Sequence, residues 1–149
     1  MRKIEYVMTK DVTACRADNN LAEVGALMWD HNCGALPVLD NEGRVVGMIT
    51  DRDICIAITT KNRPASDIKV DEVMSKQIHI CSIEGGIEDA IEVMRNAKVR
   101  RIPVVDRNLH LKGIITLSDL LIRSDEDAVA ATILKSIYED VKPLALAAS

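Results

Sequence analysis

The sequence predicts an α/β (α+β) fold of two β-α-β-β-α repeats, related by a pseudo-twofold axis and packed through their sheets, plus a C-terminal helix. First, residues 7–54 align without a gap on residues 73–120, and 12 of the 48 aligned positions are identical, whereas chance would give about three. Second, each copy shows the same succession of strand and helix patterns. Third, one copy of roughly 50 residues would bury too little surface to be stable alone, so two copies are expected to share a core.

The first part of each copy is an extended segment followed by an amphipathic helix. The extended segments cover residues 12–15 and 78–81, and the first helix runs from about Leu21 to His31. Its apolar positions recur with helical spacing, so one face is expected to be buried. These positions are Leu21, Val24, Gly25 and Met28 in the first copy and Ile87, Ala90, Ile91 and Met94 in the second.

Two strands and a second helix complete each copy. A proline near the start of the first strand is tolerated there, because that position can lack a hydrogen-bond donor. A polar turn at residues 40–43 precedes the next strand in the first copy. The predicted strands are residues 36–39 and 45–50 in the first copy and 102–105 and 111–116 in the second, and the closing helices begin near Asp51 and Leu117.

These elements set the expected domain boundaries. Repeat 1 spans residues 7–60 and repeat 2 spans residues 73–123, and the two form one module. A polar turn at residues 61–64 lies in the connection between them. A C-terminal helix is expected over residues 125–142, because apolar residues recur every four positions and Pro143 stops the pattern.

The composition excludes several classes of function. Aromatic residues make up only 2% of the chain, with no Phe, which disfavours a nucleic-acid surface built from stacked rings. The net charge is −4 and no long basic run occurs, so no nucleic-acid partner is expected. The apolar stretches are too short to cross a bilayer, and the charged N-terminus does not resemble an export signal. We therefore expect a cytoplasmic protein with no membrane partner.

The cysteines favour reduced thiols in a cytosolic protein over a disulfide framework or a zinc site. They are scattered among apolar neighbours and never form a Cys-x-x-Cys pair. No metal and no required cofactor are expected. The four positions are Cys15, Cys33, Cys55 and Cys81.

The repeated segments resemble the CBS-domain family, named after cystathionine β-synthase, over roughly residues 7–122. The resemblance implies a tandem pair that folds as one module, commonly as a homodimer, and binds adenosine-type ligands as a regulatory sensor. The segments that carry it are Val7-Met8-Thr9, residues 34–40 and residues 47–53 in the first copy, and Val73-Met74-Ser75, residues 99–106 and residues 113–119 in the second.

A Thr-x-x-Asp sequence follows the last strand of each copy. In structural terms it is a capping box, in which Thr50 or Thr116 and the acid three residues later satisfy free helix amides. In functional terms the carboxylates of Asp53 and Asp119 could accept ribose hydroxyls, while the threonine hydroxyl and helix-start amides face a phosphate. The family resemblance implies these ligand roles at the same positions.

The residues before the first strand differ between the copies. Arg100 and Arg101 could bind a phosphate through their guanidinium groups, or could be ordinary exposed charges. The first copy has Gly34 and Ala35 at the matching places, so two equivalent phosphate sites are not expected. On this ground the cleft of Thr116 and Asp119 is expected to bind a nucleotide more tightly than that of Thr50 and Asp53.

The extended segments are the third candidate component. The resemblance implies that their backbones hold an adenine edge, each paired with the Thr/Asp turn of the other copy. They could equally be ordinary strand residues. The candidates are Val12, Thr13, Ala14, Ile78, His79 and Ile80.

These observations predict a regulatory binding module rather than an enzyme, because the chain holds no recognisable catalytic triad or glycine-rich phosphate loop. The expected ligand is AMP, ADP, ATP or a relative such as S-adenosylmethionine, read by an unidentified protein partner. A ligand-independent dimerisation module is the alternative. Apolar residues beyond one core face favour a homodimer in either case. They are Ile54, Ile56, Ala57 and Ile58, with Leu120, Leu121 and Ile122 in the second copy.

Overall fold

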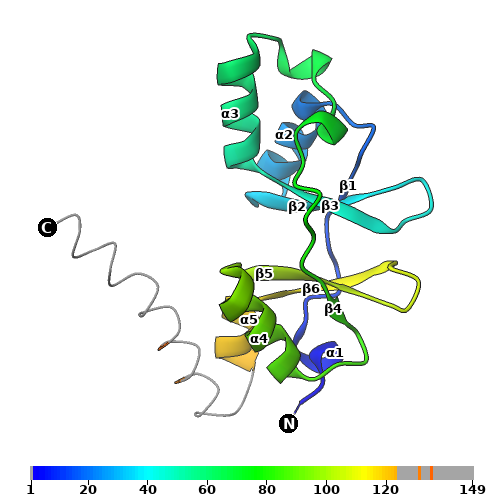
Figure 1. Cartoon of the computed structure of the whole chain (residues 1–149), viewed down its shortest axis with the longest axis vertical. Helices are drawn as coiled ribbons and strands as arrows, with labels where there is room; N and C mark the ends of the chain where they lie inside the picture. Colours follow the sequence, from blue (N-terminus) through cyan, green and yellow to red (C-terminus); the bar gives the residue numbers. More distant parts are fainter. Residues whose placement is uncertain (1, 124–130, 132–134, 136–149) are drawn as a thin grey trace, which may run out of the picture. The chain divides into compact units, whose positions relative to one another are not determined.

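The computed structural model describes residues 2–123 together with residues 131 and 135 (Figure 1). The helix predicted over residues 125–142 therefore lies outside the described residues, apart from these two positions. The described chain divides into two compact units. Unit 1 contains residues 2–10, 79–106 and 112–123, and unit 2 contains residues 11–78 and 107–111.

Unit 2 carries the first β-α-β-β-α repeat. Strand β1 runs parallel to β2, and β2 runs antiparallel to β3, which gives a three-stranded sheet in the order β1-β2-β3. Its elements are β1 (Cys15–Arg16), α2 (Leu21–Asp30), β2 (Ala35–Leu39), β3 (Val45–Thr50) and α3 (Asp51–Lys61), followed by the 3-10 turns η1 (Ala65–Asp67) and η2 (Val70–Glu72).

Unit 1 repeats this arrangement, with its sheet in the order β4-β5-β6 and β4 parallel to β5. The predicted α/β fold with two β-α-β-β-α repeats is therefore confirmed. The short N-terminal helix α1 (Ile4–Val7) was not predicted, because four residues are too few to show a periodic pattern. The other elements are β4 (Cys81–Ser82), α4 (Ile87–Ala97), β5 (Arg101–Val105), β6 (Leu111–Thr116) and α5 (Leu117–Arg123).

The extended segments form less strand than the sequence suggests. Only Cys15–Arg16 and Cys81–Ser82 are strands, because pairing with the neighbouring strand begins at Cys15 opposite Val38 and at Cys81 opposite Val104. Residues 12–14 and 78–80 lie outside the assigned strands.

The amphipathic helices bury the predicted face. The side chain of Asn20 caps α2 by accepting a 2.9 Å hydrogen bond from the amide of Glu23. Helix-start amides have no partner within the helix, so this contact fixes where α2 begins. Leu21, Val24 and Met28 are buried in α2, and the matching Ile87, Ala90 and Met94 are buried in α4.

Each sheet is extended by a segment that precedes a repeat. The amide of Thr9 donates to the carbonyl of Ile114 at 2.8 Å, and the reverse bond measures 2.9 Å. In unit 2, Ser75 and Met48 exchange the same two bonds, at 2.9 and 3.1 Å. The N-terminal segment thus completes the sheet of unit 1, although the repeat alignment counts it with the first copy.

None of the described helices has the length and apolarity needed to cross a bilayer.

Candidate ligand-binding site

Both Thr-x-x-Asp sequences form the predicted capping boxes with matching geometry. The amides of Asp53 and Asp119 donate to the threonine Oγ1 three residues earlier, each at 3.1 Å. The amides of Thr50 and Thr116 donate to Oδ2 of the aspartates, each at 2.9 Å. Each box therefore occupies Oδ2 of its aspartate and leaves Oδ1 outside the box. The four side chains are half-buried, so they are fixed in place but still in contact with solvent.

The residue before the first long strand lies beside each box. The carbonyl of Gly34 accepts from the amide of Asp51 at 2.9 Å, and the carbonyl of Arg100 accepts from the amide of Leu117 at 2.8 Å. In unit 2, Ala35 is also the register partner of Thr50. The structure thus brings Gly34 and Ala35 next to the first capping box.

The same backbone contact places Arg100 next to the second box. Its side chain is exposed, as is that of Arg101 at the start of β5. A phosphate near Thr116 could therefore meet charged side chains, which are absent at the matching positions of unit 2. We call Arg100, Thr116 and Asp119 the Asp119 half-site, and Gly34, Thr50 and Asp53 the Asp53 half-site.

Gly34 lies close to the carboxylate of Asp51. A Cβ atom at Gly34 would lie 2.9 Å from Oδ2 of Asp51, which is the end of an exposed side chain that can move aside. Gly34 and Asp51 also line a hollow of about 430 Å³ in unit 2, together with Trp29 and other residues of α2 and α3.

The residues of both extended segments are half-buried, and the two units divide them. Residues 12–14 and Ile78 belong to unit 2, whereas His79 and Ile80 belong to unit 1. His79 lines a separate hollow of about 460 Å³ with residues of α4, including Asp89 and Glu92. Among the described residues of each unit, no hydrogen bond joins these residues to a capping box.

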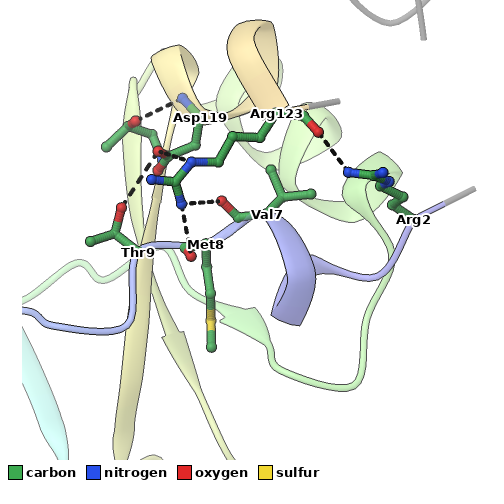
Figure 2. Close-up of polar contacts among 7 residues, drawn as sticks. Arg2, Val7, Met8, Thr9, Asp119 and Arg123 are labelled. Atoms are coloured by element: carbon green, nitrogen blue, oxygen red, sulfur yellow. Dashed lines mark hydrogen bonds and ion pairs between the residues drawn. The ribbon is translucent and has the colours of Figure 1, made fainter. Parts of the chain in front are cut away.

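Asp119 has further partners that sequence reasoning missed (Figure 2). Its Oδ1 accepts a 3.5 Å hydrogen bond from Oγ1 of Thr9 and lies 3.9 Å from Nε of Arg123. Nη1 of Arg123 also donates to the carbonyls of Val7 and Met8, each at 3.3 Å. A signal for this difference appears when the repeat offset of 66 residues is continued three positions past the aligned range, because Arg123 then matches Ala57.

The most buried thiols are poor candidates for chemistry. Burial raises the pKa of Cys15 and of Cys81 to about 11, so both remain protonated near neutral pH. Within the described part of the chain, no three His, Cys, Asp or Glu side chains are grouped as a metal site would require.

Comparisons with known proteins agree with the internal repeat. The "CBS domain-containing protein YhcV" of Bacillus subtilis (strain 168) is 34% identical over 137 residues, covering 92% of this chain and 96% of that protein. Inosine-5'-monophosphate dehydrogenase of Methanocaldococcus jannaschii is 37% identical over 123 residues, or 83% of this chain. The match covers only 24% of that enzyme, so it transfers no catalytic activity to this chain.

Solved structures agree as well. Hypoxic Response Protein I, solved with two coordinated zinc ions, has a TM-score of 0.74 at 28% identity, covering 83% of this chain and 99% of that chain. The CBS domain pair of protein MJ0100, in complex with 5-methylthioadenosine and S-adenosyl-L-methionine, has a TM-score of 0.70 at 22% identity. That match covers 80% of this chain and 92% of the other and shows the fold alone. The CBS domain family itself matches residues 4–60 and again residues 70–126, and this chain belongs to that family.

Proposed function

We propose that this CBS pair is a regulatory module that binds an adenosine-type ligand through the carboxylates of Asp53 and Asp119. The observation that carries the proposal is the repeated capping box, which holds each aspartate by Oδ2 and leaves Oδ1 outside the box. A carboxylate oxygen accepts hydrogen bonds from hydroxyl groups, and a ribose offers two neighbouring hydroxyls. A half-buried carboxylate fixed by its own backbone contacts loses little side-chain freedom when it binds such a group.

The residues around each box supply the other contacts in this proposal. Arg100 and Arg101 bind phosphate at the Asp119 half-site, while Gly34 and Ala35 leave that role to backbone amides in unit 2. In this proposal, residues 12–14 and 78–80 contact the adenine ring. The complex of the MJ0100 domain pair with two adenosine compounds supports this choice of ligand class, because the same fold accepts them.

A second candidate function is dimerisation without a ligand. The observation in its favour is the exposure of large apolar side chains on the helices. Trp29 on α2 is 86% exposed and Ile122 on α5 is 79% exposed, while Ile56 and Ile58 on α3 are 47% and 41% exposed. Large apolar side chains that remain in water often mark a protein interface. We propose a homodimer through these helices, which is compatible with ligand binding and would be the whole function if no ligand binds.

A thermal-shift panel tests the proposal. The probes are adenosine, AMP, ADP, ATP, S-adenosylmethionine and 5'-methylthioadenosine, with 2'-deoxyadenosine 5'-monophosphate as the matched control that lacks one ribose hydroxyl. A ligand at 100 times its dissociation constant stabilises the folded state by about 2.7 kcal/mol. We expect at least one ribose-containing probe to raise the melting temperature and the deoxy control to raise it less.

Two outcomes would contradict the proposal. If every probe leaves the melting temperature unchanged, the proposal that the module binds an adenosine-type ligand is wrong, and dimerisation without a ligand is favoured. Equal shifts by AMP and its 2'-deoxy analogue would show that the aspartates do not read the ribose. Light scattering tests the dimer separately, and a concentration-independent mass equal to the 16.4 kDa of one chain would exclude it.

A further inference from the structure

The two half-sites differ at the carboxylate itself. Oδ1 of Asp119 is the atom left outside the capping box, and it already has two partners in unit 1. Thr9 donates to it at 3.5 Å, and the guanidinium Nε of Arg123 lies 3.9 Å away (Figure 2). The Asp119 side chain is only 12% exposed, whereas that of Arg123 is 50% exposed. A partly exposed cation therefore lies beside this carboxylate.

Arg123 is held in this position by the N-terminal segment. Its Nη1 donates to the carbonyls of Val7 and Met8, each at 3.3 Å. The side chain of Arg2 donates in turn to the carbonyl of Arg123 at 2.9 Å. The two carbonyls orient the guanidinium beside Asp119, and the contact from Arg2 holds the backbone of Arg123.

The matching place in unit 2 has a different composition. Ala57, buried in α3, stands where α5 has Arg123, and Ser75 stands where the N-terminal segment has Thr9. The hydroxyl of Ser75 donates to the carbonyl of Gln77 at 3.5 Å. Among the contacts of the described residues, Asp53 has its capping box but no ion pair with an arginine or lysine.

We propose that Arg123 competes with the ribose of a ligand for Asp119, so that an adenosine ligand without phosphate fills the Asp53 half-site first. The inference rests on the proposed function and adds an order of filling to it. A ribose hydroxyl at Asp119 must share Oδ1 with Thr9 and displace or reorient Arg123. At Asp53 the same hydroxyl meets a carboxylate that no arginine occupies.

The proposal separates two kinds of ligand. Arg100 and Arg101 favour the Asp119 half-site only when the ligand carries a phosphate that they can bind. A ligand such as adenosine lacks that group, so the competition by Arg123 decides the order. A half-exposed ion pair of this kind changes an affinity by about 1.4- to fivefold, because exposed pairs are worth roughly 0.2–1 kcal/mol.

Calorimetric titration with adenosine and AMP tests the inference in variants that keep one half-site. Asp53→Asn leaves the Asp119 half-site, and Asp119→Asn leaves the Asp53 half-site; in both, the amide oxygen can still accept the capping bond. Arg123→Gln is then added to each background. Arg95→Gln is the matched control, since it removes one exposed charge from α4 of the same unit.

We expect adenosine to bind about 1.4- to fivefold more weakly in Asp53→Asn than in Asp119→Asn. Adding Arg123→Gln should restore the lost adenosine affinity in the Asp53→Asn background and leave the affinity in the Asp119→Asn background unchanged. Arg95→Gln should leave the affinity unchanged in both backgrounds. If Arg123→Gln lowers the affinity of the Asp119 half-site, or leaves it unchanged, the inference is wrong. If the wild-type chain binds AMP but does not bind adenosine, the inference is wrong and the proposed function still stands. If neither compound binds the wild-type chain, the proposed function fails and this inference fails with it.

Discussion

Gly113→Ala tests whether the N-terminal segment is packed against β6 as closely as the structure shows. A Cβ atom on Gly113 would lie 2.6 Å from Sδ of Met8 and 2.8 Å from the carbonyl oxygen of Thr9. The methionine side chain can move aside, but the carbonyl belongs to the backbone pair between Thr9 and Ile114. The substitution therefore has to push the segment away from the sheet.

The magnitude follows from two opposing effects. Overpacking a close contact costs about 1–3 kcal/mol, and weakening the two bridging hydrogen bonds adds about 0.5–1.5 kcal/mol for each bond lost. Replacing a glycine also reduces the entropy of the unfolded chain, which returns about 0.4–1 kcal/mol. We expect Gly113→Ala to lower the free energy of unfolding by about 1–3 kcal/mol. Gly47→Ala should act similarly in unit 2, because its Cβ atom would lie 2.7 Å from the carbonyl oxygen of Ser75.

Gly25→Ala is the matched control on α2. A Cβ atom at Gly25 meets nothing within 4 Å, and alanine is favoured over glycine inside a helix by about 0.8–1 kcal/mol. Urea unfolding of the three variants should therefore give one stabilised and two destabilised proteins. Hydrogen exchange at the Thr9 and Ile114 amides should increase in Gly113→Ala. Stability of Gly113→Ala equal to that of Gly25→Ala, with unchanged exchange at Thr9, would refute the reasoning.

Three further perturbations test the caps and the titrating groups. Thr50→Ala removes the hydroxyl that accepts from the Asp53 amide and should lower the unfolding free energy in urea by about 1 kcal/mol, whereas wild-type stability would contradict the capping role. Burial raises the pKa of Cys15 and Cys81 from 9.0 to about 11, so the unfolded chain releases these protons first and the free energy of unfolding should fall between pH 9 and about 11. Urea unfolding of Cys15→Ala should show a shallower fall over this pH range. A fall as steep as that of the wild type would exclude this thiol as a cause. The hydrogen bond from Arg63 lowers the pKa of Glu72, so the contribution of ionised Glu72 to stability is present above about pH 4.5 and is lost as the pH falls through the lower folded pKa. Thermal melts should show a lower melting temperature for Glu72→Gln than for the wild type at pH 6, and this difference should narrow in acid. A difference that stays constant with pH would contradict the linkage.

Much of the fold could be predicted because local signals coincide with the repeat. Both Thr-x-x-Asp sequences mark the place at which a strand ends and a helix begins. Strands β3 and β6 have the predicted bounds, and α3 and α5 begin at Asp51 and Leu117, near which their starts were predicted. The buried faces of α2 and α4 follow from helical spacing alone. These features depend on neighbours within a few positions in the chain.

Features that depend on distant contacts could not be predicted in this way. The pairing of Thr9 with Ile114 joins residues more than 100 positions apart, and the alignment alone places that segment in the first copy. The role of Arg123 depends on the same pairing, because only the folded N-terminal segment brings Val7, Met8 and Thr9 to α5. The sequence indicated the candidate carboxylates and the difference between Arg100 and Gly34, but not the contacts of Asp119 with Thr9 and Arg123.

Titration calorimetry with AMP on the wild-type chain and on the double variant Asp53→Asn/Asp119→Asn tests whether the two aspartates bind the ligand. Asparagine keeps an oxygen for the capping bonds from Thr50 and Thr116, so the fold should be retained and circular dichroism can verify it. We expect AMP to bind the wild-type chain saturably. The affinity for AMP should fall at least about tenfold when both carboxylates are replaced, since hydrogen bonds to charged groups contribute about 1.5–3 kcal/mol. Unchanged affinity in the folded double variant would contradict it.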